Sequence, residues 1–314
     1  MTWRRINTEC MKFFKRGKGF PVLAVIITAA LIAAVFLFLE RMELPDDSAT
    51  RKGRKTAPPK KALKQKTPER RPPVAERREQ QIAVIIDDIG YDLGAAEELA
   101  RIRAPIAFAV LPHTPHAAEA AEILHAAGKE ILLHLPMEPR SYPGENPGAG
   151  ALMADMDEKE IRRQIALDLA AVPYVSGVNN HMGSRFMEDD IRLSVVMDEL
   201  KKRGLFFVDS RTASDSRGKE AAARARVRFA ERSVFIDHTR GYAAALANLT
   251  RLPRQGGEGG EPLLMIGHPH PETVRALKEV LPIWREEGVR MIPVSAYLSA
   301  SGGKEKENFL VKTR

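Results

Sequence analysis

Short apolar runs alternate with helical patterns over residues 81–294, and this alternation constrains the fold more than any other feature of the chain. Eight runs fit buried strands, at residues 82–87, 106–111, 130–135, 175–180, 205–210, 234–237, 263–268 and 289–294. Most are continuously apolar, which is typical of parallel strands covered on both faces. Strands that alternate with helices form βαβ units, and about seven or eight such units favour a barrel over an open sheet.

The segments between these runs carry the periodicity of amphipathic helices. Five are clear, at residues 92–102, 116–128, 157–172, 192–204 and 272–288. Gly128, Gly204 and Gly288 follow three of them, where the chain needs a residue with positive φ. We therefore predict one α/β barrel domain over residues 80–298, a length sufficient for a sizeable core.

An apolar segment without a charged residue, residues 20–39, precedes this domain. It is long enough to span the hydrocarbon core of a membrane. A cleaved signal peptide is the alternative, but the segment exceeds the usual apolar region and no small-residue cleavage site precedes Glu40. We expect an uncleaved transmembrane anchor.

Charge on either side of the segment predicts its orientation. Six basic residues precede it (Arg4, Arg5, Lys12, Lys15, Arg16, Lys18), and four acidic residues closely follow it (Glu40, Glu43, Asp46, Asp47). The positive-inside rule then places residues 1–19, a basic tail, in the cytoplasm, although the basic run from Arg51 weakens this argument. We expect a single-pass protein of a bacterial inner membrane, with its main domain periplasmic or extracellular.

The formal net charge of +8 does not describe the domain, because the basic excess lies before it. Residues 51–78 hold twelve basic and two acidic residues, whereas residues 79–314 hold 30 basic and 34 acidic. A nucleic-acid partner is therefore not expected. Residues 40–79 are rich in Pro, Lys and Arg and are predicted to form a disordered linker, and residues 299–314 a disordered tail.

The single cysteine, Cys10, lies before the apolar segment. It excludes a disulfide within the chain, and it leaves the domain without a thiol for catalysis or zinc binding.

Ionisable residues gather where the predicted strands end. Asp87, Asp88, His134, His181, Asp209, Asp237 and His268 all lie at or just after such an end. The carboxyl ends of parallel barrel strands share one rim, so these residues should converge. Buried charges need compensation, and His with Asp suits zinc or a similar divalent ion.

Single residues of these types also have structural explanations. An aspartate at a strand end often caps the next helix, and this explanation is at least as good for Asp237. A lone histidine is more often structural than a ligand, so we assign no role to five others (His113, His116, His125, His238, His270).

Six segments resemble the divergent polysaccharide deacetylase family, in order and across nearly all of residues 80–298. They are IAVIIDDIG (82–90), FAVLPHTPHA (108–117), EILLHLPMEP (130–139), GVNNHMGSRF (177–186), FFVDSRT (206–212) and IGHPHPET (266–273). The resemblance implies a NodB-like (β/α) barrel of about seven parallel strands. It also implies a metal-dependent hydrolase, with zinc as the expected metal, that removes acetyl groups from a polysaccharide or cell-wall glycan.

The family also implies roles for individual residues. Asp87 would be the general base and Asp88 a metal ligand, with His134 as a second ligand and His268 as the general acid. The chain departs from the ordinary His-x-x-x-His motif, because Glu138 occupies the position of its second histidine. We predict that His181 replaces this missing ligand, with Glu138 as the alternative. Supporting or substrate-contacting roles are expected for Glu138, Asn180, Arg185, Asp209 and Arg211.

Three functions remain open on these grounds. The first is a metal-dependent carbohydrate N- or O-deacetylase that faces the cell envelope. The second is a catalytically inactive protein of the same fold that binds a glycan or a protein partner there. The third is a different metal-dependent hydrolase, because a fold does not fix a function.

Overall fold

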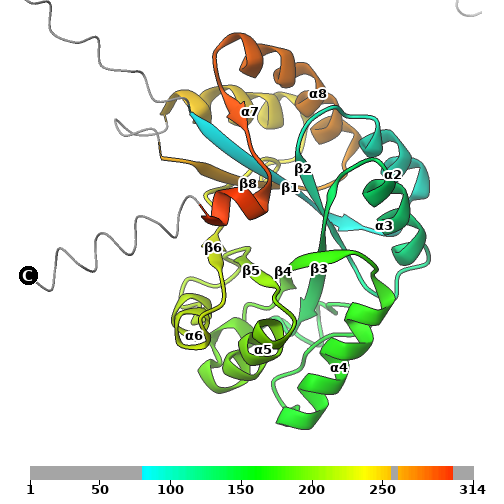
Figure 1. Ribbon diagram of the computed structural model, residues 1–314, viewed down its shortest axis with the longest axis vertical. Coiled ribbons are helices and arrows are strands. Elements are labelled where there is room, and N and C mark those ends of the chain that lie inside the picture. Colours follow the sequence, from blue (N-terminus) through cyan, green and yellow to red (C-terminus); the bar gives the residue numbers. More distant parts are fainter. Residues whose placement is uncertain (1–79, 256–260, 300–314) are drawn as a thin grey trace, which may run out of the picture. The chain divides into compact units, whose positions relative to one another are not determined.

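Nine strands form one sheet in the part of the chain that the computed structural model describes, residues 80–255 and 261–299 (Figure 1). The strands are β1 (Gln81–Ile89), β2 (Ile106–Val110), β3 (Glu130–Met137), β4 (Val175–Met182), β5 (Phe206–Asp209), β6 (Phe229–Glu231), β7 (Val234–Phe235), β8 (Leu263–Gly267) and β9 (Arg290–Met291). Their order is β6-β5-β4-β3-β2-β1-β8-β7, with β9 beside β1, and all pairings are parallel. All carboxyl ends therefore lie at the same end of the sheet.

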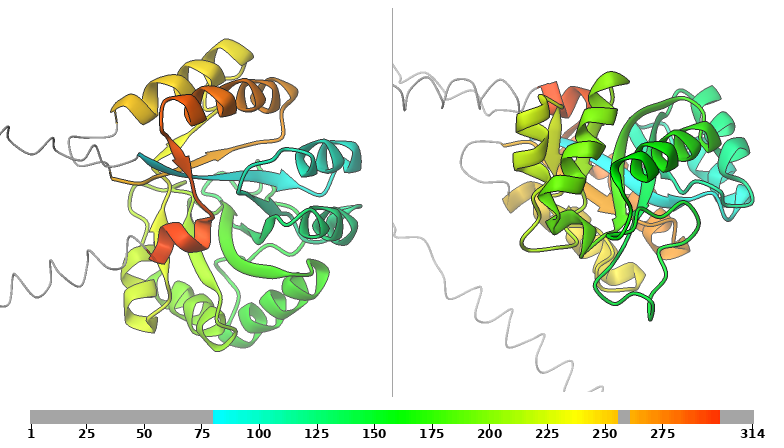
Figure 2. Two further views of the ribbon diagram at one scale, coloured as in Figure 1. Left: turned by 45° about the horizontal axis from the view of Figure 1, so that its top comes forward. Right: turned by 90° about the horizontal axis from the view of Figure 1, so that it is seen from below.

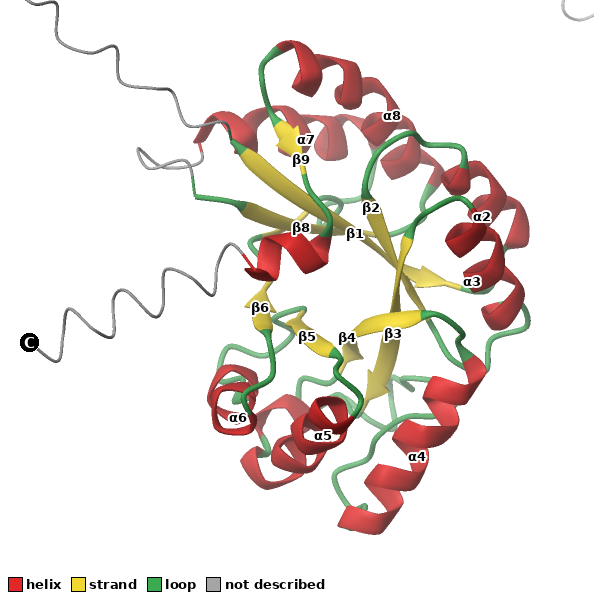
Figure 3. Ribbon diagram, in the orientation of Figure 1, coloured by secondary structure: helices red, strands yellow, loops and turns green. Residues whose placement is uncertain are grey.

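Helices surround the outside of the curled sheet (Figure 3). They are α2 (Leu93–Ala100), α3 (Ala117–Ala126), α4 (Glu158–Ala171), α5 (Asp190–Lys202), α6 (Gly218–Ala225), α7 (Tyr242–Gln255) and α8 (Pro271–Glu286). Each of the eight predicted runs overlaps a strand, and each of the five predicted helical segments overlaps a helix. The predicted α/β alternation is confirmed, and Gly128, Gly204 and Gly288 have positive φ values of 74°, 72° and 74°.

One short segment, residues 229–235, links the two edges of the curled sheet. Its first half is β6, which pairs with β5, and its second half is β7, which pairs with β8. The backbone N–H of Ser233 also donates to the carbonyl of Leu264. Residues 229–235 can be counted as one strand of the curl. With the six longer strands they give seven, which agrees with the expected number of about seven. Strand β6 has no counterpart among the apolar runs, because only its middle residue is buried.

Two apolar layers follow from the alternation of side chains along each strand. In β1, Ile82, Val84 and Ile86 belong to the layer between sheet and helices, whereas Ala83 and Ile85 belong to the layer inside the curl. At Asp87 the inward positions change from apolar to charged. In β1, the apolar inner layer therefore ends at Ile85, shortly before the carboxyl end of the strand.

The opposite end of the inner layer is covered by the last described segment. Ile292, Val294 and Leu298 are buried in the inner layer. The backbone of Ile292 bonds to Ile82 at the start of β1, and that of Ser295 bonds to Glu130 at the start of β3. The segment thus lies at the amino-terminal end of the sheet (Figure 2). Buried polar residues such as Asp87 and His134 lie towards the other end of their strands.

Residues 1–79 and 300–314 lie outside the described residues, and with them the predicted tail, anchor and linker. Among the helices that the structure describes, none is both long and apolar enough to cross a membrane.

Candidate metal centre

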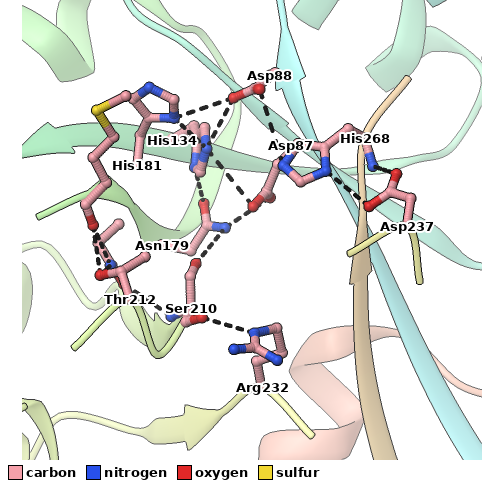
Figure 4. A network of polar contacts seen from close by, with 12 residues as sticks. Asp87, Asp88, His134, Asn179, His181, Ser210, Thr212, Arg232, Asp237 and His268 are labelled. Atoms are coloured by element: carbon pink, nitrogen blue, oxygen red, sulfur yellow. Dashed lines mark hydrogen bonds and ion pairs between the residues drawn. The ribbon is translucent and has the colours of Figure 1, made fainter. Parts of the chain in front are cut away.

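The carboxyl end of β1 brings two aspartates to one place. In a regular strand, Asp87 and Asp88 would point to opposite faces of the sheet. The β1–β2 register shifts between Ile86 and Ile89, and Asp88 has a φ of 57°, a left-handed conformation that aspartate tolerates. Both carboxylates consequently approach His134, whose Nε2 atom lies 3.7 Å from Asp87 Oδ2 and 3.2 Å from Asp88 Oδ1 (Figure 4).

Asp88, His134 and His181 each direct one ligand atom to a common point. His134 Nε2 and His181 Nδ1 are 3.1 Å apart, and each lies 3.2 Å from Asp88 Oδ1. Ligands held at roughly 2.0–2.2 Å from zinc lie roughly 3–3.5 Å from one another, so this triangle fits a bound cation. Asp88 Oδ1 is also buried and receives no hydrogen bond from the described residues. One carboxylate and two imidazoles suit zinc or a similar divalent ion.

Asn179, inward on β4, fixes the protonation of His134. Its Nδ2 donates to Asp87 Oδ1 at 2.8 Å, so its Oδ1 faces His134 Nδ1 at 2.9 Å. Because an amide oxygen only accepts hydrogen bonds, His134 Nδ1 carries the proton. The Nε2 lone pair of neutral His134 is thereby directed towards Asp88 and His181. A metal-binding histidine characteristically has such an outer partner.

His268 approaches the cluster from β8, on the other side of Asp87. Its Nδ1 lies 2.9 Å from Asp237 Oδ1, which leaves Nε2 directed inward, 4.0 Å from Asp88 Oδ2. Asp237 is itself fixed, because its Oδ2 accepts from the His268 backbone N–H at 2.7 Å and from Thr273 Oγ1 at 2.9 Å. The pair therefore holds one imidazole in a defined orientation beside the two aspartates.

The environment separates the two aspartates chemically. Burial raises the pKa of Asp87, although His134 and His268 act in the opposite direction. Burial acts to raise the pKa of Asp88 as well, but the adjacent rings of His134 and His181 hold it well below its ordinary value. Asp88 is therefore the stable anion of the pair, and Asp87 the carboxylate that more readily accepts a proton.

The histidines show that this cluster requires positive charge. Burial lowers the pKa of His134, but Asp87 and Asp88 raise it to about 9. Burial also lowers the pKa of His268, and Asp237 more than reverses this effect. At His134, a divalent cation would supply the positive charge in place of the proton.

The alternative ligand, Glu138, is engaged elsewhere. Its Oε1 pairs with Arg185 Nη1 at 2.6 Å, and its Oε2 accepts from the backbone N–H of Ala154 at 2.6 Å. It does not belong to the group of three potential ligands. Glu138 and Arg185 instead connect the loop after β3 to the segment after β4.

Three other predicted residues lie around the β4–β5 junction. Asn180 accepts from the backbone N–H of Ser210 at 2.9 Å and donates to Thr212 Oγ1 at 3.1 Å. Asp209 accepts from the backbone N–H of Arg211 at 2.7 Å and from a serine hydroxyl. These contacts order the loop after β5, and none of them reaches the group of three ligands.

Two features of the site were not predicted from the sequence, the position of Asn179 and the pairing of Asp237 with His268. Asn179 is a neutral amide, and the sequence gives no reason to choose it over its neighbour Asn180. The only signal is strand alternation, which places Asn179 on the same face of β4 as His181. Asp237 fits a helix cap by its position, and its bond to His268 joins residues 31 positions apart. Asp87, Asp88, His134, His181 and His268 are brought together as the sequence predicts, and their roles remain predictions.

A family model described as divergent polysaccharide deacetylase matches residues 84–298. An uncharacterized Escherichia coli K12 protein, YibQ, is 36% identical over 204 residues, which are 64% of this chain and 62% of that protein. An uncharacterized Haemophilus influenzae protein is 28% identical over 221 residues, 70% of this chain and 75% of that protein. The chain thus spans about three-fifths of the length of the E. coli relative.

The solved structures include one with the same arrangement of elements. It is that of an uncharacterized protein from Agrobacterium tumefaciens C58, which is 24% identical and has a TM-score of 0.66. The similarity covers 71% of this chain and 91% of that one. At this level of identity the comparison shows the fold.

Proposed function

Because the chain belongs to the divergent polysaccharide deacetylase family, we propose that it is a metal-dependent hydrolase that removes acetyl groups from an envelope glycan. The observation that carries this proposal is the placement of Asp87 between two different groups. Asp88, His134 and His181 lie on one side of it, and the His268–Asp237 pair lies on the other. A base, a candidate metal site and an acid therefore surround one point, which is the arrangement that amide hydrolysis requires.

Asp88, His134 and His181 would hold the divalent metal, most plausibly zinc given their donor atoms. When bound, it would lower the pKa of water and polarise the acetyl carbonyl. Asn179 contributes by keeping the His134 lone pair available, and Asp88 contributes the negative charge.

Asp87 acts as the general base. Its Oδ1 accepts from Asn179, and its Oδ2 has no hydrogen-bond donor among the described residues other than the nearby His134. A burial-raised pKa makes this carboxylate a better proton acceptor than an exposed aspartate. It removes a proton from the water that adds to the acetyl carbonyl.

His268 acts as the general acid. Asp237 accepts the Nδ1 proton and stabilises the protonated ring, so a second proton is held at Nε2. This proton passes to the leaving amine as the C–N bond breaks. The products are acetic acid, which ionises to acetate, and a free amino sugar. Hydrolysis leaves Asp87 protonated and His268 neutral, and proton exchange with solvent restores both residues before the next turnover.

The decisive experiment compares metal content and acetate release in the full chain. Wild type should contain about one divalent metal per chain and release acetate from a penta-N-acetylated chitooligosaccharide. His134→Ala and His181→Ala should lose the metal, because each removes one of three ligands. Asp87→Asn should retain the metal and lose at least about a hundredfold in rate.

Asp198→Asn, a change on the exposed face of α5, is the matched control and should alter neither quantity. Acetate release that persists in Asp87→Asn would refute the assigned base. Metal binding without acetate release from any acetylated glycan would instead support the inactive binding protein of the same fold.

A further inference from the structure

Arg232 adjoins the candidate site by two independent routes. Its Nε donates to the carbonyl of Ser210 at 2.7 Å, and the Ser210 hydroxyl lies 3.4 Å from Asn179 Nδ2, which bonds to Asp87 (Figure 4). Its guanidinium also lies 3.7 Å from the ring centroid of Phe235, and this ring stacks on His268 at 5.8 Å. Arg232 is therefore connected to the general base through Ser210 and Asn179, and to the general acid through the ring of Phe235.

Arg211, on the loop after β5, is held close to Arg232. Arg232 Nη2 lies 3.3 Å from the Arg211 carbonyl, and the Arg211 N–H donates to Asp209 Oδ1 at 2.7 Å. These bonds hold Arg211 at a φ of 52°, a left-handed conformation that is costly for arginine. Such conformations persist where the surroundings over-determine them, commonly at ligand sites. The Arg211 side chain is exposed, so packing of this side chain into the core does not explain the strained backbone.

Neither guanidinium group forms a hydrogen bond or close ion pair with a carboxylate of the described residues, although the charge of the buried Asp209 acts on both. Arg232 uses two of its nitrogens on backbone carbonyls, and Nη1 has no hydrogen-bond partner among the described residues. Asp209 directs its oxygens to the Arg211 N–H and to Ser216 Oγ. Burial and the charge of Arg211 lower the pKa of Arg232, whereas the charges of Asp209 and Asp87 act to raise it. Because Asp209 is buried and its oxygens are used within the loop, the exposed Arg211 and the free Nη1 of Arg232 still offer donors to an anion that arrives from solvent.

We propose that Arg211 and Arg232 form an anion-binding subsite beside the metal centre, and that the substrate is an acetylated amino sugar bearing a carboxylate or a phosphate ester. This inference rests on the proposed function and specifies its substrate class. The planar guanidinium matches either anion with paired N–H donors. The exposed Arg211 meets the ligand from solvent, and the half-buried Arg232 anchors it beside Asp87 and His268.

Binding to the metal-loaded full chain tests this subsite without turnover. Calorimetry would compare N-acetylmuramic acid, N-acetylglucosamine 6-phosphate and neutral N-acetylglucosamine. At least one acidic sugar should bind wild type about tenfold more tightly than the neutral sugar, and comparison of the two acidic sugars shows which anion is preferred. Arg211→Asn should abolish the preference. Asparagine tolerates the left-handed backbone, so this variant is expected to fold.

Arg232→Lys and Arg232→Gln separate charge from structure. Lysine should retain part of the preference and glutamine should lose it, whereas Arg163→Gln, on the exposed face of α4, should leave it unchanged. Equal or absent binding of all three sugars to wild type would overturn the subsite, as would a preference that survives Arg211→Asn. Acetate release from neutral glycans alongside that result would leave the proposed function intact, so the two failures are distinguishable.

Discussion

At the scale of single residues, Asn179 determines which nitrogen of His134 faces the candidate metal. Asn179→Ala would leave His134 free to place its proton on Nε2, the atom that faces Asp88 and His181. Loss of such an outer partner typically weakens metal binding by about 10- to 100-fold. We expect a weakening of this size in Asn179→Ala, measured by competition with a chelator.

Asn180→Ala is the matched control, because Asn180 is the next residue and is equally buried. Its side chain bonds to Ser210, Met182 and Thr212, so its loss should reduce the free energy of unfolding by about 1–3 kcal/mol. Its metal affinity should stay at the wild-type value. Equal metal affinities in the two variants would contradict the role given to Asn179.

A second His–Asp pair, in which the aspartate alone is buried, predicts how stability depends on pH. Asp168 on α4 is fully buried and bonds to His113 at 2.8 Å and Gln164 at 2.9 Å. Burial raises its pKa to about 6 from an ordinary value of 3.8, although both partners act to lower it. The folded chain then binds this proton more tightly than the unfolded chain. The contribution to stability is full below about pH 4 and is lost as pH rises through about 6.

Asp168→Asn removes this titration. The free energy of unfolding of the variant minus that of wild type should rise between about pH 4 and pH 7, by up to about 3 kcal/mol. Urea unfolding across that range measures it. Asp198→Asn, which is exposed, should give a nearly constant difference, and a constant difference for Asp168→Asn would show that its pKa is not raised.

The site was predictable from sequence only where a residue type is uncommon at its position. Charged residues at the ends of apolar runs identify Asp87, Asp88 and His134, because a barrel places all these ends on one rim. Asn179 was not predictable, since an amide has an ordinary explanation at its position. Asp237 was expected at the rim, but its pairing with His268 was not predictable, since an aspartate there could equally cap a helix. Arg232 lies before the apolar run at residues 234–237 and not at its carboxyl end, so nothing in the local pattern directs attention to it.

At the scale of elements, long apolar runs predicted the strands because a strand buried on both faces leaves a continuous signature. Strand β6 leaves none, since its outer residues are partly exposed. The closure of the sheet by residues 229–235 was equally hidden, because one short segment pairs with strands on both sides in turn. Such pairing depends on tertiary geometry and not on local composition.

The inner face of β4 provides a test of packing between strands. Gly177 pairs with Phe206 of β5, and a Cβ atom at Gly177 would lie 2.1 Å from the Phe206 ring. Phe206 is fully buried, so its ring has no free space to move into. Gly177→Ala should lower the free energy of unfolding by about 1–3 kcal/mol, measured by urea denaturation.

Phe206→Leu in the same chain should make the Gly177→Ala change less costly than it is in wild type, because the smaller side chain relieves the overlap. Gly204→Ala supplies the comparison. Its φ of 72° makes alanine unfavourable, but no neighbour lies within 4 Å of the added atom. Its cost should therefore be independent of Phe206→Leu. Full additivity of Gly177→Ala with Phe206→Leu would contradict the packing argument.

At the scale of the whole domain, the two ends of the curled sheet differ, because a chain segment covers one end and the candidate metal centre lies at the other. The described chain begins at the amino-terminal end, where Gln80 bonds to Arg290, and residues 292–298 cover the inner core at that same end. The candidate metal centre lies at the carboxyl end. Residues 1–79 therefore join the described domain at the end away from the candidate metal centre.

This arrangement suits our proposal that residues 20–39 anchor the chain in the inner membrane with the domain outside the cytoplasm. Alkaline phosphatase fused after Leu298 should be active, because its disulfides form only outside the cytoplasm. Deletion of residues 20–39 should abolish that activity, since the apolar segment directs export. A tag placed before residue 1 should stay with the membrane fraction if the segment is an anchor, and should be lost from the mature chain if it is a cleaved signal. Phosphatase activity that is absent from the full-length fusion would refute the orientation and, with it, an envelope glycan as substrate, because a cytoplasmic domain would have no access to one.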